Sequence, residues 1–600
     1  MHKEFLMGNE AIAMGAVAAG VNLVSGYPGT PSTEVLETIA RLNDGSIYVE
    51  WSVNEKAGLE VAAGASYSGA RTMVTMKQVG LNVASDPLMS LEYVGIKGGM
   101  VVMVADDPGP ISSQTEQDTR TFASYSKLPC FDPSSAQEAY EMMIEAFEYS
   151  EKYGTPVLFR PTTRVCHAYA SVSVREESEY YVNIPTGFFK DPSRWVIFPK
   201  LSNANHAKIE LRNRELSSEF SSYARNSIIP SSSRLGIATH GISFANTMET
   251  LSSLSDRPSV LKIATPFPFP EKLALEFLSS VDEVLCIEEL DPVIERALIA
   301  VCGKYGLSVK IRGKMTDDVK LSGENLRDDV TSYIYKFLGL EVPSVSVPDT
   351  PELPVRPPVL CAGCPHRASF YAVKHAMKGR ETIFAGDIGC YTLGNAMPLD
   401  MVDTCLCMGA GVNIAQGVGR IKPDTKCFAF VGDSTFFASA ITGAVNAVYN
   451  QADMTLIVLD NSTTAMTGHQ PHPGTGKTMM GEITQAIDIE AVLRGVGVTV
   501  VERVNPLELE KAVETVKRVA DLPGVKAILF ESPCAMLFKP EKPLAVTDSC
   551  VDCRMCIKEI GCPGLIVSDN KVKIDPSLCN GCGLCSQVCP VGAISKEGSL

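Results

Sequence analysis

The sequence predicts a multidomain α/β protein that ends in a small α+β domain, and three observations support this. The chain has 600 residues, more than one hydrophobic core usually serves. Over most of its length, short apolar runs alternate with helical stretches rich in alanine and glycine, the pattern of doubly wound parallel sheets. Near the C-terminus this alternation gives way to two copies of one cysteine pattern.

Composition narrows the class of protein. No apolar run reaches the roughly 20 residues of a membrane span, so we expect a soluble protein without a membrane partner. The net charge of −16 would repel nucleic acid. The alanine-rich stretch from Ala11 to Val24 follows Glu4 and Glu10, where a signal peptide would be basic, and it predicts a helix.

The first two α/β domains are expected in residues 1–175 and 176–342. The second domain begins with a polar stretch, from about Val172 to Arg234, that we expect to be irregular. The strands predicted from apolar runs in these two domains are Arg71–Met76, Met100–Val104, Leu235–Thr239, Val260–Ile263 and Val284–Glu288.

A proline-rich linker is expected at residues 343–358, followed by a third α/β domain at 359–540 and the cysteine-rich domain at 541–600. The strands predicted in the third α/β domain are Cys427–Val431, Thr455–Leu459 and Ala527–Glu531.

The cysteine-rich domain has the spacing of two [4Fe-4S] clusters. Its second copy reads C-x2-C-x2-C-x3-C-P, in which the fourth cysteine ligates the other cluster. The predicted ligand sets are Cys550, Cys553, Cys556 and Cys589 for one cluster, and Cys579, Cys582, Cys585 and Cys562 for the other.

Two features qualify this interpretation. The gap before Cys562 is longer than the gap before Cys589, so Cys562 is the weakest of the eight assignments. A zinc ribbon or a disulfide scaffold would be the alternatives, although the first needs two cysteine pairs per metal and the second suits secreted chains.

Thiolate ligands favour a reducing compartment, and we expect the cytoplasm.

A magnesium–diphosphate site is predicted in the third α/β domain. Gly432-Asp433-Ser434 follows the predicted strand Cys427–Val431, and Asn461 follows the next strand. Parallel strands end at a common edge of the sheet, and carboxylate and amide oxygens suit Mg2+. Gly-Asp-Ser alone is a common turn, but with the spaced asparagine it resembles the thiamin diphosphate signature.

Taken together, the motifs resemble those of the 2-oxoacid:ferredoxin oxidoreductases, and within them the large subunit of the indolepyruvate branch. The resemblance implies a pyrimidine-binding thiamin domain at 1–175, a transketolase C-terminal-like α/β domain at 176–342, a diphosphate-binding thiamin domain at 359–540 and a two-[4Fe-4S] ferredoxin-like domain. The motifs that carry it are Tyr27–Ser32, Glu288–Pro292, Cys361–Arg367, Gly432–Ser434 and the cysteine pattern.

The resemblance also implies cofactor-binding residues. The thiamin diphosphate and Mg2+ ligands would include the backbone carbonyl of Thr463, and Met408 would pack against the aminopyrimidine, although a glycine turn with a core methionine is an alternative. The full set is Met408, Gly409, Gly432, Asp433, Ser434, Thr435, Asn461 and Thr463.

Four catalytic residues are implied. Glu55 would face N1′ of the aminopyrimidine so that the cofactor can lose its C2 proton; alternatively, Ser52-x-x-Glu55 is a capping box. Thr30 would hydrogen-bond the 2-oxo acid, unless its loop is only a turn that caps a helix. His469 and His472 would move protons near the thiazolium, or lie in an ordinary surface loop.

A third cluster is implied by four further cysteines, with buried thiols as the alternative. They are Cys361, Cys364, Cys390 and Cys534, whereas Cys405 and Cys407 are expected in the core.

The resemblance implies oxidative decarboxylation of aryl 2-oxo acids, indolepyruvate and phenylpyruvate, with electrons passed to ferredoxin and the acyl group to coenzyme A. It also implies a small β subunit that binds coenzyme A and an α2β2 assembly. Pyruvate or 2-oxoglutarate as the substrate, a non-oxidative decarboxylase, and an electron carrier with an inactive thiamin site remain alternatives.

Overall fold

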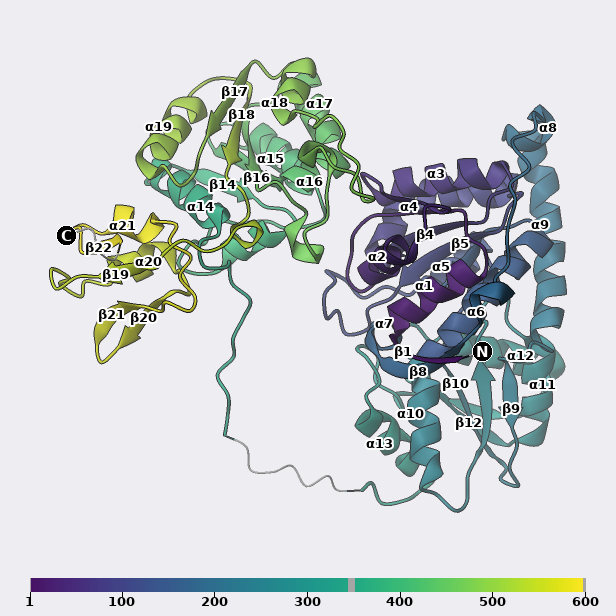
Figure 1. The fold of residues 1–600 in the computed structure, drawn as a ribbon. Helices are drawn as coiled ribbons and strands as arrows, with labels where there is room; N and C mark the ends of the chain where they lie inside the picture. Colours follow the sequence, from purple (N-terminus) through teal and green to yellow (C-terminus); the bar gives the residue numbers. More distant parts are fainter. Residues whose placement is uncertain (1, 344–350, 597–600) are drawn as a thin grey trace. The chain divides into compact units, whose positions relative to one another are not determined.

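The computed structural model describes residues 2–343 and 351–596, which form two compact units, one on each side of the gap (Figure 1). Of the predicted linker, residues 344–350 lie outside the described residues, and residues 351–358 form neither helix nor strand. Within the described ranges, no helix is both long and apolar enough to cross a bilayer.

The first unit contains a six-stranded sheet whose strands are all parallel, which confirms the predicted fold class. Helices cover both of its faces (Figure 1). In spatial order the strands are β3 (Tyr48–Trp51), β2 (Leu23–Gly26), β4 (Thr72–Lys77), β5 (Met100–Ala105), β7 (Val157–Phe159) and β6 (Cys130–Phe131). The helices are α1 (Gly8–Ala18), α2 (Thr33–Leu42) and α6 (Ala136–Tyr153) on one face, and α3 (Glu55–Tyr67), α4 (Gln78–Val94) and α5 (Thr119–Ser126) on the other.

A second sheet of five strands completes this unit, and only its edge strand β9 is antiparallel. Its order is β13 (Lys310–Arg312), β12 (Glu283–Ile287), β10 (Leu235–His240), β11 (Ser259–Ile263) and β9 (Ser227–Ile229). Its helices are α10 (Gly241–Ser252), α11 (Glu271–Ser280), α12 (Val293–Tyr305) and α13 (Arg327–Phe337). A short antiparallel pair, β1 (His2–Met7) with β8 (Tyr169–Val174), lies beside α1.

Two local predictions in this unit were wrong. The helix predicted over Ala11–Val24 ends at Ala18, and Val24 belongs to β2. The stretch predicted to be irregular contains the 22-residue helix α9 (Pro199–Phe220), after the short α7 (Thr163–His167) and α8 (Pro192–Trp195). Helix α9 buries a narrow stripe, Ile209, Leu216 and Phe220, so its mostly polar surface hid the helical period.

Buried charges join the two sheets of the first unit. The Arg120 guanidinium is fully buried and donates hydrogen bonds to Asp118, to Glu288 and to the Glu289 carbonyl. It also lies 3.0 Å from Nε2 of His240, whose Nδ1 is 2.6 Å from Asp132. The Glu288–Pro292 motif therefore anchors the second sheet to α5 of the first.

The second unit contains a five-stranded, fully parallel sheet with helices on both faces. Its order is β14 (Thr382–Ala385), β15 (Lys426–Gly432), β16 (Met454–Asp460), β18 (Val525–Glu531) and β17 (Val500–Val504). One face carries α15 (Ala410–Ile421), α17 (Ile441–Tyr449) and α18 (Ile489–Gly495), and the other carries α14 (Pro365–Ala376) and α19 (Leu509–Ala520).

The cysteine-rich part packs on α14 and α19, because Ala368 and Leu509 share its small core. Arg367 of α14 reinforces this contact by donating to the carbonyls of Ile560 and Gly561. Its elements are the antiparallel pairs β19 (Leu544–Val546) with β22 (Ile594–Lys596) and β20 (Leu565–Ser568) with β21 (Lys571–Ile574), and helices α20 (Met555–Ile560) and α21 (Leu584–Val588).

The buried charge network predicts an acid-sensitive fold. Burial, followed by the charge of Arg120, lowers the pKa of His240 from 6.5 to about 4. Below pH 6.5, His240 therefore becomes protonated in the unfolded chain but stays neutral in the folded chain. We expect His240 to cost about 2 kcal/mol of stability between pH 6.5 and pH 5.

The measurement is the thermal midpoint under argon from pH 7 to pH 5, compared with His240→Gln, whose midpoint should depend less steeply on pH. His206→Gln, a change at a more exposed histidine, is the control and should keep the wild-type slope. Parallel curves for wild type and His240→Gln would contradict the assignment.

Candidate functional site

The carboxyl ends of β15 and β16 bring the predicted magnesium residues together. The two strands pair in parallel, with Gly432 opposite Leu459, so Asp433 lies beside the start of the next loop. The Asn461 backbone N–H donates to Oδ2 of Asp433 at 3.1 Å, and the Ser434 N–H donates to Oδ1 at 2.8 Å. The carboxylate is thus buried and held by the backbone on both sides.

Three oxygen atoms converge at this edge. Oδ1 of Asn461 faces the Thr463 carbonyl oxygen at 2.8 Å and Oδ2 of Asp433 at 3.3 Å. Without a cation, the amide would turn its NH2 group toward these acceptors. Mg2+ holds oxygens at about 2.0–2.1 Å in an octahedron, so adjacent ligands lie about 3 Å apart, close to the spacing here. Asp433, Asn461 and Thr463 can therefore hold Mg2+.

His366, which the sequence analysis did not assign to the site, supports this arrangement. Its ring is buried, and burial lowers its pKa to about 4, so the imidazole is neutral. Its Nε2 lies 3.4 Å from Nδ2 of Asn461 and accepts from the amide in the orientation that leaves Oδ1 facing the other oxygens. The signal in the sequence was the histidine of the Cys361–Arg367 motif.

A helix starts at the same edge. Asp433–Thr435 begin it and a π-turn at Phe436–Ala440 continues it into α17. Free N–H groups at a helix N-terminus suit a diphosphate, and π-turns are frequent at functional sites. A Cβ on Gly432 would lie 2.7 Å from the Tyr391 ring, and Tyr391 donates to Thr435, so Gly432 is needed for this packing as well as for any approach to phosphate.

The predicted pyrimidine segment lies against Asp387. The Gly409 N–H donates to Oδ2 of Asp387 at 2.7 Å, and burial raises the pKa of this carboxyl to about 7. Gly409 has φ of 82° and leaves no room for a Cβ beside Ser439, which donates to the Met408 carbonyl. The segment is therefore a tightly held glycine turn whose methionine is only partly buried.

The two predicted histidines have different surroundings. His472 is buried, with Nε2 3.1 Å from Oδ2 of Asp433, although the ring nitrogen is not aligned for a hydrogen bond. His469 is exposed, and its Nε2 lies 3.9 Å from Sγ of Cys534. One histidine thus faces the candidate metal ligand, and the other faces a predicted cluster cysteine.

The four cysteines of the possible third cluster gather beside this edge. Burial raises the pKa of Cys390 to about 11, and Cys534, Cys361 and Asp433 act in the same direction. Burial also raises the pKa of Cys364 to about 12, again with Cys390 and Cys361 close by. The Cys534 N–H donates to the Asn461 carbonyl at 2.9 Å, which ties this set to the candidate magnesium site.

Cys405 and Cys407, predicted in the core, are exposed, so that prediction was wrong. The loop that carries them pairs with the edge strand β14 only at Thr404 and then leads into the glycine turn at Gly409.

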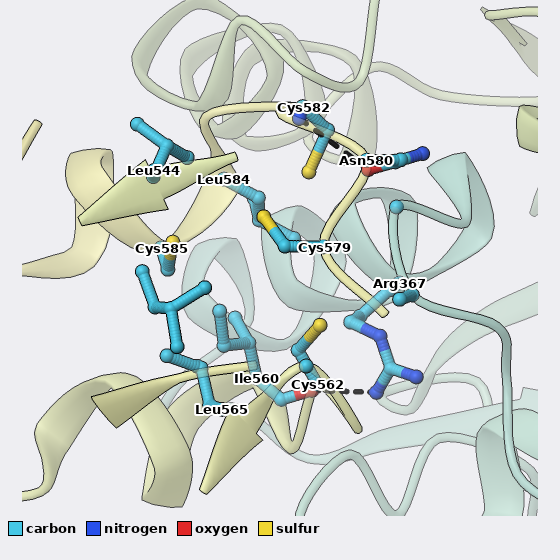
Figure 2. A pocket seen from close by; sticks show the side chains of 14 residues that line it. Arg367, Leu544, Ile560, Cys562, Leu565, Cys579, Asn580, Cys582, Leu584 and Cys585 are labelled. Carbon is cyan, nitrogen blue, oxygen red and sulfur yellow. Dashed lines mark hydrogen bonds between the residues drawn. The ribbon is translucent and has the colours of Figure 1, made fainter. Parts of the chain in front are cut away.

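The second ligand set of the tail surrounds a small cavity. Figure 2 shows Cys562, Cys579, Cys582 and Cys585 around this space, with Arg367 at its side. The fold thus brings Cys562, the weakest assignment, to the other three. Near Cys556, the sulfurs of Cys589, Cys553 and Cys550 raise its pKa after burial, so the first set is also gathered.

Among the described residues, all nineteen cysteines are free thiols, and no group of three or more His, Cys, Asp or Glu side chains has the spacing of a single-ion site. This excludes the disulfide scaffold within the described fold.

In the first unit, Glu55 is the first residue of α3, and the cap is Asn54, which accepts from the Ala57 N–H. The capping-box alternative is therefore wrong, and Ser52 instead donates to Glu50. The Glu55 carboxyl lies against Gly80, where a Cβ would come within 2.4 Å of Oε1. Desolvation raises its pKa, with Lys77 as the opposing charge.

The Thr30 loop lies at the carboxyl end of β2. Ser32, at the N-cap of α2, donates to the Gly29 carbonyl instead of capping the helix, and Ser112 donates to the Thr30 carbonyl at 3.0 Å. A Cβ on Gly29 would lie 3.3 Å from the Lys77 side chain. Lys77, which the sequence analysis missed, therefore lies between the Thr30 loop and Glu55.

Comparison with known families matches three parts of the chain. Residues 14–198 match the family described as pyruvate flavodoxin/ferredoxin oxidoreductase, thiamine diphosphate-binding. Residues 387–528 match the C-terminal TPP-binding domain of thiamine pyrophosphate enzymes, and residues 572–595 match a 4Fe-4S binding domain.

Two curated relatives are similar over nearly the whole chain. Indolepyruvate oxidoreductase subunit IorA of Methanothermobacter thermautotrophicus is 42% identical over 99% of this chain and 98% of its own length. The protein of the same name from Archaeoglobus fulgidus is 40% identical over 100% of this chain and 98% of its own. Among solved structures, 2-oxoglutarate:ferredoxin oxidoreductase from Magnetococcus marinus aligns with a TM-score of 0.43 at 16% identity, covering 52% of this chain and 62% of that chain.

The oxygen cluster predicts a sensitive metal ligand. Asp433→Asn removes the charge that faces the cation and leaves the burial unchanged. We expect the affinity for thiamin diphosphate in the presence of Mg2+ to fall by more than roughly 100-fold, beyond the 10–100-fold typical of an outer-shell change. Calorimetric titration with the cofactor measures this.

Asp424→Asn makes the same chemical change near the opposite, amino end of β15, on an exposed loop, and should bind as the wild type does. Equal affinities for Asp433→Asn and Asp424→Asn would show that Asp433 does not hold the metal.

Proposed function

This chain belongs to the indolepyruvate oxidoreductase subunit IorA family, and from that premise we propose that it oxidatively decarboxylates aryl 2-oxo acids, indolepyruvate and phenylpyruvate among them. In this proposal the electrons pass through [4Fe-4S] clusters to a ferredoxin, and the acyl group passes to coenzyme A. The observation that carries it is the contact between the oxygen cluster at Asp433 and Asn461 and a set of four cysteines.

We also propose a partner. The relatives are named as subunits, which supports a complex with a second, smaller β subunit. In the proposed α2β2 assembly, that subunit binds coenzyme A, and this chain carries thiamin diphosphate, Mg2+ and the clusters.

Each unit carries residues that we propose for the cofactor chemistry. When bound, thiamin diphosphate would supply a nucleophilic carbon suited to attack on the 2-oxo carbon and to loss of CO2. In the second unit, Asp433, Asn461 and Thr463 would hold its diphosphate through Mg2+, with Gly432, Ser434 and Thr435 at the helix N-terminus. Buried His472, whose Nε2 lies 3.1 Å from Oδ2 of Asp433, would move protons beside the cofactor.

The first unit would supply the proton chemistry and a substrate contact. Glu55 is proposed to hold a proton at N1′ of the aminopyrimidine, which suits a carboxyl whose pKa is raised by desolvation. Thr30 would donate a hydrogen bond to the 2-oxo acid. Exposed His469 remains the candidate for moving protons to and from solvent.

The iron–sulfur clusters that the cysteine sets would hold would accept electrons one at a time. The set Cys361, Cys364, Cys390 and Cys534 would hold the first cluster next to the thiamin site, because Cys534 is hydrogen-bonded to the Asn461 backbone. The tail sets would hold two more, for a total of three.

The proposed reaction predicts a specific product. With coenzyme A, ferredoxin and indolepyruvate under argon, the complex should yield indoleacetyl-CoA and reduced ferredoxin. Glu55→Gln should slow exchange of the thiamin C2 proton for deuterium by roughly 10²–10⁴-fold, the range for general acid–base catalysis. NMR of the acid-quenched cofactor measures the exchange.

Glu60→Gln, an exposed change on the same helix, is the matched control and should exchange at the wild-type rate. Indoleacetaldehyde without ferredoxin reduction would identify a non-oxidative decarboxylase. Turnover confined to pyruvate or 2-oxoglutarate would refute the aryl substrate.

Three clusters predict about twelve iron atoms per chain and two predict about eight. We expect about twelve in the wild type and about eight in Cys390→Ser, measured as iron and acid-labile sulfide. Cys427→Ala changes a thiol buried in β15 and should retain all of the iron. A wild-type value near eight would remove the third cluster from the proposal.

A further inference from the structure

A buried cation separates two of the cysteine sets. Arg367 is 3% exposed and belongs to α14 of the thiamin-binding part, yet it lines the cavity formed by Cys562, Cys579, Cys582 and Cys585 (Figure 2). Its guanidinium also donates to the carbonyl of Leu360, next to Cys361, so the same side chain lies near both sets.

The hydrogen bonds of Arg367 fix its position. The guanidinium donates to the carbonyls of Ile560 at 2.7 Å and Gly561 at 2.9 Å, just before Cys562, and to the carbonyl of Leu360, just before Cys361. These three bonds satisfy NH1 and NH2 but none neutralises the charge. A buried charge without a counterion is costly, so an anion is expected beside it.

Part of the guanidinium has no acceptor among the described residues. Its Nε atom is buried and without a hydrogen-bond partner. The neighbouring groups that can become anionic, as cluster ligands, are cysteine sulfurs: burial lowers the pKa of Arg367, whereas Cys562, Cys364, Cys361 and Cys582 act in the opposite direction. An iron–sulfur cluster with four thiolate ligands is anionic and would supply both the charge and the acceptor.

The loop that carries Cys361 and Cys364 packs closely against the tail. Gly363, at φ of 73°, lies so close to Asn580 that a Cβ would come within 1.8 Å of its side-chain nitrogen. Asn580 in turn accepts from the Cys582 N–H. This contact brings the loop of Cys361 and Cys364 against the loop of Cys579 and Cys582.

We propose that Arg367 raises the reduction potential of the cluster held by Cys562, Cys579, Cys582 and Cys585, and that Nε donates a hydrogen bond to it. Reduction adds one negative charge to the cluster, and a buried guanidinium stabilises that charge more than it stabilises the oxidised form. The thiamin-binding part thus sets the potential of a cluster in the tail. This rests on the proposed cluster site and not on the substrate.

A redox titration of the purified complex, followed by electron paramagnetic resonance, tests this without turnover. Arg367→Gln should shift the reduction equilibrium of one tail cluster at least tenfold toward the oxidised form, which is about 59 mV for one electron. The other tail cluster should not move. Arg367→Lys keeps the charge and should recover most of the shift.

Arg380→Gln is the matched control, because Arg380 lies just beyond α14 with a solvent-exposed partner, Asp521, and should titrate as the wild type does. An unchanged potential in Arg367→Gln with full iron content would overturn the proposal.

Arg367→Gln leaves three carbonyl groups without their donor and can lose iron, so a second measurement uses the wild-type side chain. Protein labelled with guanidino-15N arginine should show a 15N hyperfine coupling to the reduced cluster that Arg367→Lys abolishes. Absence of that coupling would overturn the proposal. Iron analysis distinguishes this outcome from failure of the proposed function. A wild-type protein that contains no iron would refute the proposed function itself.

Discussion

The parallel pairing of β15 with β16 is the interaction on which the candidate site in the second unit depends. Its register sets Gly432 opposite Leu459, so the residues that follow each strand, Asp433 and Asn461, meet at one edge. Hydrophobic cores on both faces of the sheet hold this register. A slip of one residue would reverse the faces of the strand and separate the oxygens that face one another here.

From this edge, contacts between neighbouring groups lead to the tail. Asn461 is hydrogen-bonded to Cys534, whose set includes Cys361 and Cys364, and Arg367 follows on α14. The Arg367 guanidinium then lies at the cavity of the second tail set. In the proposed reaction, two electrons leave in single steps and need acceptors close to the carbon that loses them; this succession of groups lies within one compact unit.

The first unit contains charged side chains that are buried in its interior. Arg120, Glu288, His240 and Asp132 form a buried network that joins two sheets, and removing one member would leave its partners without compensation. The surroundings of the Glu55 carboxyl are different. It lies against Gly80, and burial raises its pKa. Burial also raises the pKa of Glu288 inside the network, so what distinguishes Glu55 is that its carboxyl lies against Gly80 and not against a guanidinium.

Several sequence predictions were wrong at positions where the local sequence pattern is compatible with more than one structure. Helix α9 was missed because its buried stripe is narrow, and the helix from Ala11 was drawn too long because alanine and valine also suit the start of β2. Cys405 and Cys407 were placed in the core because cysteine is often buried, yet they lie in an exposed loop between the sheet edge at Thr404 and the turn at Gly409.

The sequence by itself determined the α/β class, the strands that end at Asp433 and Asn461, and the iron–sulfur spacing of the tail, because apolar period and ligand spacing are properties of neighbouring residues. The tertiary structure alone decided that His366 faces Asn461, that Lys77 lies between Gly29 and Glu55, and that Arg367 lies between two cysteine sets. Those contacts join residues far apart in the chain, and only the packing of helices on sheets brings them within reach of one another.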